Sequence, residues 1–418
     1  MKKLIALLLA VVMVFALAAC GGSNEAPAAE EPAAEAPAAP AAEPDAAVPE
    51  APAAEPEAPA AEPAGDASGE MGASGEPSGE IAAPVEAGFP AGYTYTGENV
   101  SILFSTTFQE TATGGEIVTY FKNTLEDATN GAISVQITYG GTLFGDADQL
   151  DGVAQGAVNM IALGHNPHAD VIPLLCGVPD FAPDSVQNAL DYFNYLLFDN
   201  PESSAVLTAE AEAIGVKYLN VIPGGANAFV SSKPFTGLSD LINVSAAFGN
   251  MEAAKFSALG FTVEAVLPWD LYQSFSTGLI DASQMASTSM LQDGVAEVAP
   301  YWMYDNTYTA GNFFTVNLAW WNGLSAEAQE AIQYAANATE AFAAQYYIDA
   351  LASEAATLEG MGVTLVDLSD ADFDLWWSTI MESKAADTIA AAATNGNVAE
   401  AQTVLQAAAD FTGYDLTF

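Results

Sequence analysis

The sequence predicts an α/β protein for the part of the chain that begins at about residue 93. From there onward, short apolar segments typical of strands alternate with amphipathic segments typical of helices, and this alternation predicts largely parallel strand pairing. The composition supplies a large core, since 51% of the 418 residues are hydrophobic and 21 are Phe. The first 92 residues lack the alternation and are treated as separate segments.

The alternation can be followed along the chain. The apolar segments predict strands at residues 100–104, 133–139, 158–163, 217–221, 243–248, 262–266 and 281–286. The amphipathic segments predict helices at residues 115–129, 146–156, 188–198, 203–214, 251–259 and 269–277. Residues 325–360 contain no Pro, so they predict one long helix capped by the Ser325 side chain. Ser369, followed by several acidic residues, predicts the start of another helix.

The N-terminus is typical of an export signal. Lys2 and Lys3 precede an apolar run at residues 4–17, which is too short to span a membrane. The run ends in Leu-Ala-Ala-Cys-Gly-Gly, which resembles the lipobox of bacterial lipoproteins, in which the Cys becomes the lipidated N-terminus. Cys20 is therefore the predicted lipidation site, and the alternative is a plain signal peptide that happens to contain a Cys. Residues 21–92, rich in Ala, Pro and Glu, predict a disordered linker between this anchor and the body at residues 93–418.

The charge of the chain excludes two classes of partner. The sequence carries 54 acidic residues against 7 basic ones, for a formal charge of −47, and all of the basic residues are Lys. Such a protein is not held to nucleic acid by neutralising phosphates, and it is not drawn electrostatically to an anionic membrane surface.

The familiar signatures of catalysis and metal binding do not occur in the sequence. His165 and His168 are the only two His residues, and a zinc site needs three or four protein ligands, so we expect their segment to be a surface loop. Cys176 has only apolar neighbours of the kind found in a core, and with Cys20 it cannot form a disulfide framework. Residues 370–374 lack the Gly and Glu of a calcium loop. We therefore predict a protein that is not an enzyme and that holds no metal and no cofactor.

Several ordered segments carry a family resemblance. They lie at residues 126–133, 140–145, 155–160, 215–219, 231–241, 267–282 and 317–325, and the most specific is Leu-Pro-Trp-Asp-Leu-Tyr at 267–272. With these segments, residues 98–410 resemble the DctP-like substrate-binding subunits of TRAP transporters. The resemblance implies a two-lobed periplasmic-binding-protein-like fold with hinge strands and a long helix that spans both lobes. The implied first lobe takes in about 93–224 and 311–350, and the second about 225–310 and 351–418.

The resemblance also implies a function. Such proteins close around a small organic solute and deliver it to the membrane permease subunits of a TRAP-type secondary transporter. The alternative is a sensor of the same fold, which presents its ligand to a membrane receptor without transport.

The residues that would bind the solute follow from the same resemblance. The predicted ligand-binding residues are Thr107, His165, Asn227, Asn250, Trp269, Gln284 and Met285, although Trp269 and Met285 could equally be core residues. Members of the family bind the ligand carboxylate with an Arg, and the position that corresponds to this Arg is Ala247 here. A second position that is basic in some members corresponds to a residue near Asn227, so neither position is basic in this chain. We therefore expect the ligand not to be a simple dicarboxylate gripped by Arg.

Three kinds of ligand remain open at this point. One is a neutral polar solute stacked on Trp269, and another is a cation held by aromatic faces and acidic groups. The third is an anion reached through a bridging cation, or through Lys233 or Lys255 as point charges.

Replacing Cys20 by Ala tests the predicted anchor. We expect the variant to leave the membrane fraction, because stable anchoring needs the acyl chains that only the Cys can carry. Fractionation of cells expressing the wild type and Cys20→Ala measures this. A variant that sediments with the membranes as firmly as the wild type would show that the protein is not held by a lipid on Cys20.

Overall fold

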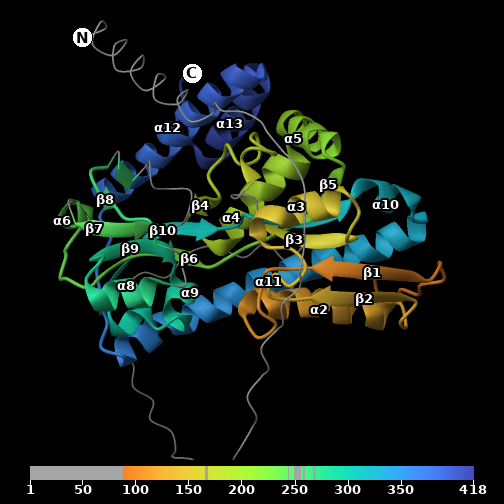
Figure 1. Cartoon of the computed structure of the whole chain (residues 1–418), viewed down its shortest axis with the longest axis horizontal. Helices are drawn as coiled ribbons and strands as arrows, with labels where there is room; N and C mark the ends of the chain where they lie inside the picture. Colours follow the sequence, from red (N-terminus) through yellow and green to blue (C-terminus); the bar gives the residue numbers. More distant parts are fainter. Residues whose placement is uncertain (1–87, 165–167, 243, 249–255, 258, 267–269) are drawn as a thin grey trace, which may run out of the picture. The chain divides into compact units, whose positions relative to one another are not determined.

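The computed structural model describes residues 88–164, 168–242, 244–248, 256–257, 259–266 and 270–418. These residues form two mixed β-sheets with helices packed around them, and the long helix α11 runs alongside elements of both sheets (Figure 1). The predicted α/β class is confirmed.

One sheet contains most of the strands predicted in the first half of the body. Its order is β2 (Ile133–Thr138), β1 (Val100–Ser105), β3 (Met160–Gly164), β11 (Asn312–Asn317) and β5 (Val216–Ile222). The predicted strands at 100–104, 133–139, 158–163 and 217–221 correspond to β1, β2, β3 and β5 with ends shifted by one or two residues. We call this the first sheet.

The second sheet contains the later predicted strands. Its order is β12 (Thr364–Leu365), β10 (Tyr301–Thr309), β6 (Ala226–Ser231), β9 (Ala282–Ala286), β7 (Ser245–Phe248) and β8 (Thr262–Val263), and β4 (Phe181–Pro183) pairs with β10. The strands predicted at 243–248, 262–266 and 281–286 correspond to β7, β8 and β9.

The expectation of largely parallel pairing is wrong. Five of the ten strand pairs among the described residues are antiparallel, and all five involve β6, β10 or β11, which the sequence pattern did not predict. Residues 223–225 connect β5 to β6, and residues 310–311 connect β10 to β11, so each short connection carries the chain from one sheet to the other. The strands on either side of the two passages are neighbours within each sheet: β5 pairs with β11 in the first sheet and β6 pairs with β10 in the second, both antiparallel.

The helices pack on these sheets. They are α2 (Thr113–Ala128), α3 (Asp146–Ala154), α4 (Val186–Asn194), a π-helical turn η2 (Tyr195–Asp199), α5 (Pro201–Ala213), α6 (Leu238–Leu241), α8 (Leu271–Thr277), α9 (Ser287–Gln292), a 3-10 turn η4 (Val295–Glu297), α10 (Leu318–Gly323), α11 (Ala326–Gly360), α12 (Asp370–Asn395) and α13 (Val398–Thr412). The helix predicted at 251–259 lies mostly outside the described residues. No helix in the described part of the chain is both long enough and apolar enough to cross a bilayer.

The long predicted helix is confirmed as α11. The Ser325 Oγ accepts a hydrogen bond from the backbone N–H of Ala328 at 3.3 Å, so the predicted cap is present. The helix contacts α2 and β5 beside the first sheet and contacts α9 and β12 beside the second (Figure 1). It therefore forms a third connection between the two sheets, in addition to the two short crossings.

The C-terminal helices also begin as the sequence predicts. The Ser369 Oγ accepts a hydrogen bond from the Asp372 N–H at 3.1 Å and caps α12. Helix α13 packs on both α12 and α5. The limits of the two lobes stay a prediction.

The segment that contains the two His residues differs from the expected surface loop. His168 is only 3% exposed, so it lies in the interior, whereas His165 lies outside the described residues. Burial lowers the pKa of His168, an effect opposed by the carboxylates of Asp170, Asp146 and Asp151. Asp146 and Asp151 belong to α3, so the buried His lies near enough to this helix to be affected by its carboxylates, a tertiary arrangement that the local pattern does not reveal.

The predicted core position of Cys176 is confirmed. Its side chain is 4% exposed and packs in the cluster that includes Leu175 and Val178. Burial raises the pKa of the Cys176 thiol to about 12, so the thiol is protonated and unreactive at neutral pH.

Two half-buried Glu residues turn their carboxyl groups onto backbone amides. Glu210 of α5 accepts from the N–H groups of Leu174 and Leu175 at 2.7 and 3.0 Å. Glu340 of α11 accepts from the Val221 N–H at 2.9 Å and from the Asn194 side-chain amide at 3.0 Å. Desolvation raises the pKa of each to about 7, although the hydrogen bonds oppose this rise.

These raised pKa values predict a pH-dependent stability. Each carboxyl group binds more protons in the folded state than in the unfolded state between about pH 4.5 and 7, so the free energy of unfolding falls as the pH rises through this range. We expect Glu340→Gln to remove part of that slope and to be more stable than the wild type at pH 8 by on the order of 2 kcal/mol. The reason is that the Asn194 amide can turn to accept from the new amide while Val221 keeps its acceptor.

Glu210→Gln is the matched comparison. Both of its donors are backbone N–H groups that cannot turn, so one of them would face the new NH₂ group, and we expect Glu210→Gln to be less stable than Glu340→Gln by about 1–3 kcal/mol at every pH. Urea unfolding of full-length protein between pH 5 and 8 measures both variants. Equal destabilisation of the two would contradict this account of the buried carboxyl groups.

Candidate functional site

The candidate site lies where the chain passes between the two sheets. The passage from β5 to β6 contains Gly224 and Gly225, and both glycines are packed closely against neighbouring elements. A Cβ on Gly224 would lie 3.0 Å from the Thr309 Cβ, and one on Gly225 would lie 3.0 Å from the Thr288 Oγ1. Larger residues would therefore push this passage away from β10 and α9.

A bulge in β10 faces this passage. Tyr304 pairs with Ala228 and Tyr308 with Ala226, so three β10 residues lie opposite the single β6 residue Asn227. Asn306, the middle residue of the three, takes a left-handed conformation with φ of 58°. Bulges of this kind redirect side chains and are common beside binding sites.

The bulge brings together four buried polar side chains, which we call the crossing network: Asn227, Gln284, Asp305 and Thr307. The Asp305 Oδ2 accepts from the Gln284 Nε2 at 2.6 Å, and its Oδ1 accepts from the Thr307 N–H at 2.9 Å and the Thr307 Oγ1 at 2.7 Å. The Thr307 Oγ1 in turn accepts from the Asn227 Nδ2 at 3.0 Å. Three strands, β6, β9 and β10, are thereby joined through side chains as well as through their backbones.

Asp305 is the only carboxylate in the crossing network, and it is fully buried. Desolvation raises the pKa of Asp305 to about 6, against the hydrogen bonds from Thr307 and Gln284, which stabilise the carboxylate. At neutral pH the group is therefore ionised and acts only as an acceptor. The three groups that donate hydrogen bonds to its carboxylate are neutral, so its orientation depends on hydrogen bonds rather than on an ion pair.

A second buried carboxylate ties α11 to the same region. Glu354 is 3% exposed and accepts from the Tyr304 Oη at 2.7 Å and the Thr288 Oγ1 at 2.9 Å. Burial and the Glu354 carboxylate both raise the pKa of Tyr304, which therefore stays protonated as a donor. Glu354 thus links the long helix to β10 and to the start of α9.

One chain of polar contacts joins helices that pack beside different sheets. The Gln292 Nε2 of α9 donates to the Thr113 Oγ1 of α2 at 3.3 Å, and that hydroxyl also lies 3.3 Å from the Tyr346 Oη of α11. The first turn of α2 follows the loop after β1, which contains the predicted ligand residue Thr107.

The structure places four of the seven predicted ligand-binding residues. Asn227 and Gln284 belong to the crossing network, and Thr107 is half-buried just beyond the carboxyl end of β1. Met285 is half-buried and lies on the opposite face of β9 from Gln284, where it packs on the cluster of Leu271 and Trp302. His165, Asn250 and Trp269 lie outside the described residues, as does the lipidation site Cys20.

The carboxamide of Asn227 is engaged at both ends. Its Nδ2 donates to Thr307, and its Oδ1 accepts from the Thr309 Oγ1 at 3.3 Å. The Gln284 carboxamide differs, because only its Nε2 is bonded, and its Oε1 accepts no hydrogen bond from any residue that the structure describes. This geometry favours a positioning role for Asn227 and a ligand-contacting role for Gln284.

The Arg position of the family resemblance is occupied by a core residue. Ala247 is 1% exposed in β7 and packs among Leu271 and Phe275. Lys233 does not take the place of the Arg, because its Nζ pairs with the Asp281 Oδ2 at 2.6 Å, just before the amino end of β9, whereas Gln284 is the central residue of that strand. Lys255 lies outside the described residues.

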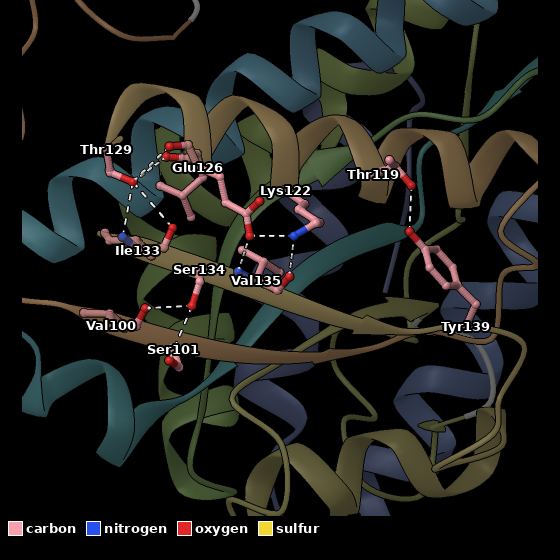
Figure 2. Close-up of polar contacts among 11 residues, drawn as sticks. Val100, Ser101, Thr119, Lys122, Glu126, Thr129, Ile133, Ser134, Val135 and Tyr139 are labelled. Atoms are coloured by element: carbon pink, nitrogen blue, oxygen red, sulfur yellow. Dashed lines mark hydrogen bonds and ion pairs between the residues drawn. The ribbon is translucent and has the colours of Figure 1, made fainter. Parts of the chain in front are cut away.

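Other Lys residues are committed to structural contacts. The Lys122 Nζ of α2 lies 2.5 Å from the Glu126 Oε1 and donates to the Val135 carbonyl at 2.7 Å, and the same Glu oxygen accepts from the Val135 N–H (Figure 2). These bonds fasten α2 to the edge strand β2. Lys384 is buried, and its Nζ donates to the Cys176 carbonyl. In the part of the chain that the structure describes, no Lys contacts the crossing network.

Two surface grooves lie elsewhere. One of about 400 Å³ is lined by residues of α13 and the start of α5, and one of about 370 Å³ is lined by α12 and the C-terminal segment. Neither is lined by a residue of the crossing network. Among the described residues, no group of three or more His, Cys, Asp or Glu side chains is placed to hold a metal ion.

Sequence reasoning missed Asp305 and Thr307, together with the strand that carries them. The run Tyr-Asp-Asn-Thr-Tyr-Thr at 304–309 does contain the Tyr and Thr residues that are enriched in strands, and its Asn is a residue type that tolerates a left-handed conformation. An acidic residue inside such a run is the one signal that could have drawn attention to the site.

Comparison with known proteins is consistent with this arrangement. The family model described as bacterial extracellular solute-binding protein, family 7, matches residues 104–386. The C4-dicarboxylate-binding periplasmic protein DctP of Rhodobacter capsulatus is 25% identical over 241 residues, which cover 57% of this chain and 71% of that protein. The ectoine-binding periplasmic protein TeaA of Halomonas elongata is 26% identical over 227 residues, which cover 52% of this chain and 63% of that protein.

Solved structures show the same fold. The ectoine-binding protein TeaA of the TeaABC TRAP transporter, in its apo state, has a TM-score of 0.65 at 17% identity and covers 75% of this chain and 99% of its own. A marine metagenome TRAP solute-binding protein specific for pyroglutamate has a TM-score of 0.62 at 20% identity, with coverage of 75% and 99%. These neighbours are two-lobed TRAP periplasmic binding proteins, so the two-lobed fold class predicted from the sequence is confirmed.

Replacing Thr307 by Val tests the crossing network. The variant keeps the size of the side chain but removes one donor to the Asp305 carboxylate and the acceptor of Asn227. We expect a loss of about 1.5–3 kcal/mol in the free energy of unfolding, because a hydrogen bond to a buried charge is lost. Thr309→Val is the comparison, since it removes only a 3.3 Å bond between neutral groups, and we expect about 0.5–1 kcal/mol. Urea unfolding at pH 7.5 measures both, and equal losses would argue against a special role for Asp305.

Proposed function

Because the chain belongs to the bacterial extracellular solute-binding proteins of family 7, we propose that it captures a small organic solute and delivers it to the permease subunits of a TRAP-type secondary transporter. The observation that carries this proposal is the family match together with the crossing network, a buried set of polar groups at the passage between the two sheets. Binding sites in α/β proteins lie beyond the carboxyl ends of strands, and the ends of β1, β3, β7 and β9 carry or precede the predicted ligand residues.

We propose that solute capture works by closure of the two lobes. The short passages at 223–225 and 310–311 are the points where a small change of backbone angles would turn one sheet relative to the other. The contact between Gln292 and Thr113 joins α9 to α2 and would hold the closed form. Closure excludes water, so that a few polar groups around the solute set its orientation.

In this proposal the solute contacts Thr107, His165, Asn250, Trp269 and Gln284, whereas Met285 packs on the opposite face of β9 and takes the core role. Asn227 acts indirectly, because both ends of its carboxamide are bonded to β10. No observation favours the sensor alternative over transport.

The proposed location is outside the cytoplasm, at the membrane surface. The supporting features are the export signal, the lipobox-like Cys20 and the linker at residues 21–92, all of which are sequence features. The extracytoplasmic relatives agree with the location, and the lipid anchor rests on the sequence alone.

The chemistry of the site argues against a dicarboxylate held by Arg. The chain contains no Arg, Ala247 occupies the relevant position, and Lys122, Lys233 and Lys384 are bonded elsewhere. Without the two hydrogen bonds that an Arg guanidinium donates to a carboxylate, the binding of that carboxylate is weaker by about 10²–10⁴-fold. The overall negative charge further slows the capture of any anion.

Mass spectrometry of small molecules that co-purify with the full-length protein is the direct test of solute binding. We also expect calorimetric titration to show no sub-micromolar binding of succinate or malate in the presence of a chelator, because no guanidinium group is available. A parallel titration with calcium tests the bridging-cation route, which predicts that binding depends on the metal. Tight binding of succinate in the presence of the chelator would show that another group of the protein binds the carboxylate in place of an Arg.

A further inference from the structure

The free end of the Gln284 carboxamide determines what kind of group this side chain offers to a ligand. A Gln side chain has a donor end and an acceptor end, and the two are interchangeable by a half-turn about its last bond. In this protein only one end is bonded to described residues, with the Nε2 on the Asp305 Oδ2 at 2.6 Å. The other end, Oε1, accepts no hydrogen bond within the described part of the chain.

Asp305 imposes this orientation. An ionised carboxylate accepts hydrogen bonds and donates none, so it can only face the NH₂ end of Gln284. Its other oxygen is occupied by two donors of Thr307, one of which is a backbone N–H that cannot turn away. The bulge at Asn306 brings Asp305 and Thr307 to this position, so the backbone of β10 determines which end of Gln284 is free.

We propose that Asp305 is a positioning residue that presents the oxygen of Gln284 to the solute, so that the site recognises an N–H donor group, such as that of an amine, amidine or amide. The inference rests on the proposed solute-binding function and adds the chemical class that this side of the site accepts. It agrees with the absence of Arg and with the formal charge of −47, both of which favour ligands that bring donors or positive charge.

The test uses a pair of ligands that differ in one group. Pyroglutamate has a ring N–H, and its lactone analogue, 5-oxotetrahydrofuran-2-carboxylate, has a ring oxygen at the same position. Full-length protein is titrated calorimetrically with both, and with ectoine, 1,4-diaminobutane and succinate, at pH 7.5, which is above the pKa of about 6 for Asp305. We expect the wild type to bind at least one N–H ligand, and to prefer pyroglutamate over the lactone by about 10- to 100-fold where that pair binds.

Asp305→Asn is the decisive variant. The side-chain oxygen of the new Asn must stay on the Thr307 N–H, so the NH₂ group of the Asn faces Gln284. The Gln284 oxygen then turns toward this NH₂ group and accepts its hydrogen bond. The NH₂ group of Gln284 then becomes the free end, and we expect the affinity for N–H ligands to fall by about 10- to 100-fold while succinate binds no worse. Asp184→Asn is the matched control, because Asp184 contacts the same bulge through the Asn306 Nδ2 at 3.3 Å but lies at the surface, and we expect it to keep the wild-type preference.

Thermal melting shows whether Asp305→Asn folds, and if it does not, a second variant tests the same inference. Gln284→Leu removes the free oxygen and leaves the two Thr307 bonds to Asp305 intact, so we expect it to lose the preference for N–H ligands.

The outcomes separate this inference from the proposed function. If a folded Asp305→Asn or Gln284→Leu keeps the wild-type ligand preference, the positioning role is wrong and solute binding stands. Wild-type binding of succinate alone, or a co-purified solute without any N–H group, would also overturn the inference. If no probe binds and nothing co-purifies, the proposed function itself fails.

Discussion

Buried carboxylates that are held by neutral donors are the constraint on which much of this structure depends. Asp305, Glu354, Glu340 and Glu210 all turn their carboxyl groups away from water, and their described partners are hydroxyl groups, amides and backbone N–H groups. In a chain with 54 acidic residues and no Arg, interior ion pairs of the usual Arg–carboxylate kind are not available. A neutral donor compensates less of the desolvation of a carboxylate than a cation does, and the pKa values of three of these groups are raised accordingly.

These carboxylates connect elements that are distant in the sequence. Glu340 joins α11 to β5 just before the first passage between the sheets, and Glu354 joins the other part of the same helix to β10 and α9. The long helix therefore holds both sheets through polar contacts as well as through its apolar face. Because hydrogen bonds depend on direction more strongly than apolar contacts do, these bonds specify the position of the helix along its axis.

The same chemistry reaches the candidate site. Asp305 has no cation beside it among the described residues, so it draws its donors from Thr307 and Gln284 and thereby sets the direction of both side chains. A protein with an Arg at position 247 would offer a ligand a positive charge, whereas in the proposed arrangement this one offers the carboxamide oxygen of Gln284. The proposal therefore fits a chain that contains no Arg.

The sequence by itself determined the α/β class, the long helix with its Ser325 cap, the start of α12 at Ser369 and the buried state of Cys176, because these features depend on local pattern and composition. Gln284 and Asn227 were reached through a family resemblance, since no local signal marks them. Only the tertiary structure decided the antiparallel pairing, the interior position of His168 and the joining of Asn227, Gln284, Asp305 and Thr307. Periodicity shows which face of a strand is buried but does not show which strands are neighbours or where two extra residues form a bulge. The crossing network depends on both, since three residues of β10 oppose one residue of β6 at the place where the chain passes between the sheets.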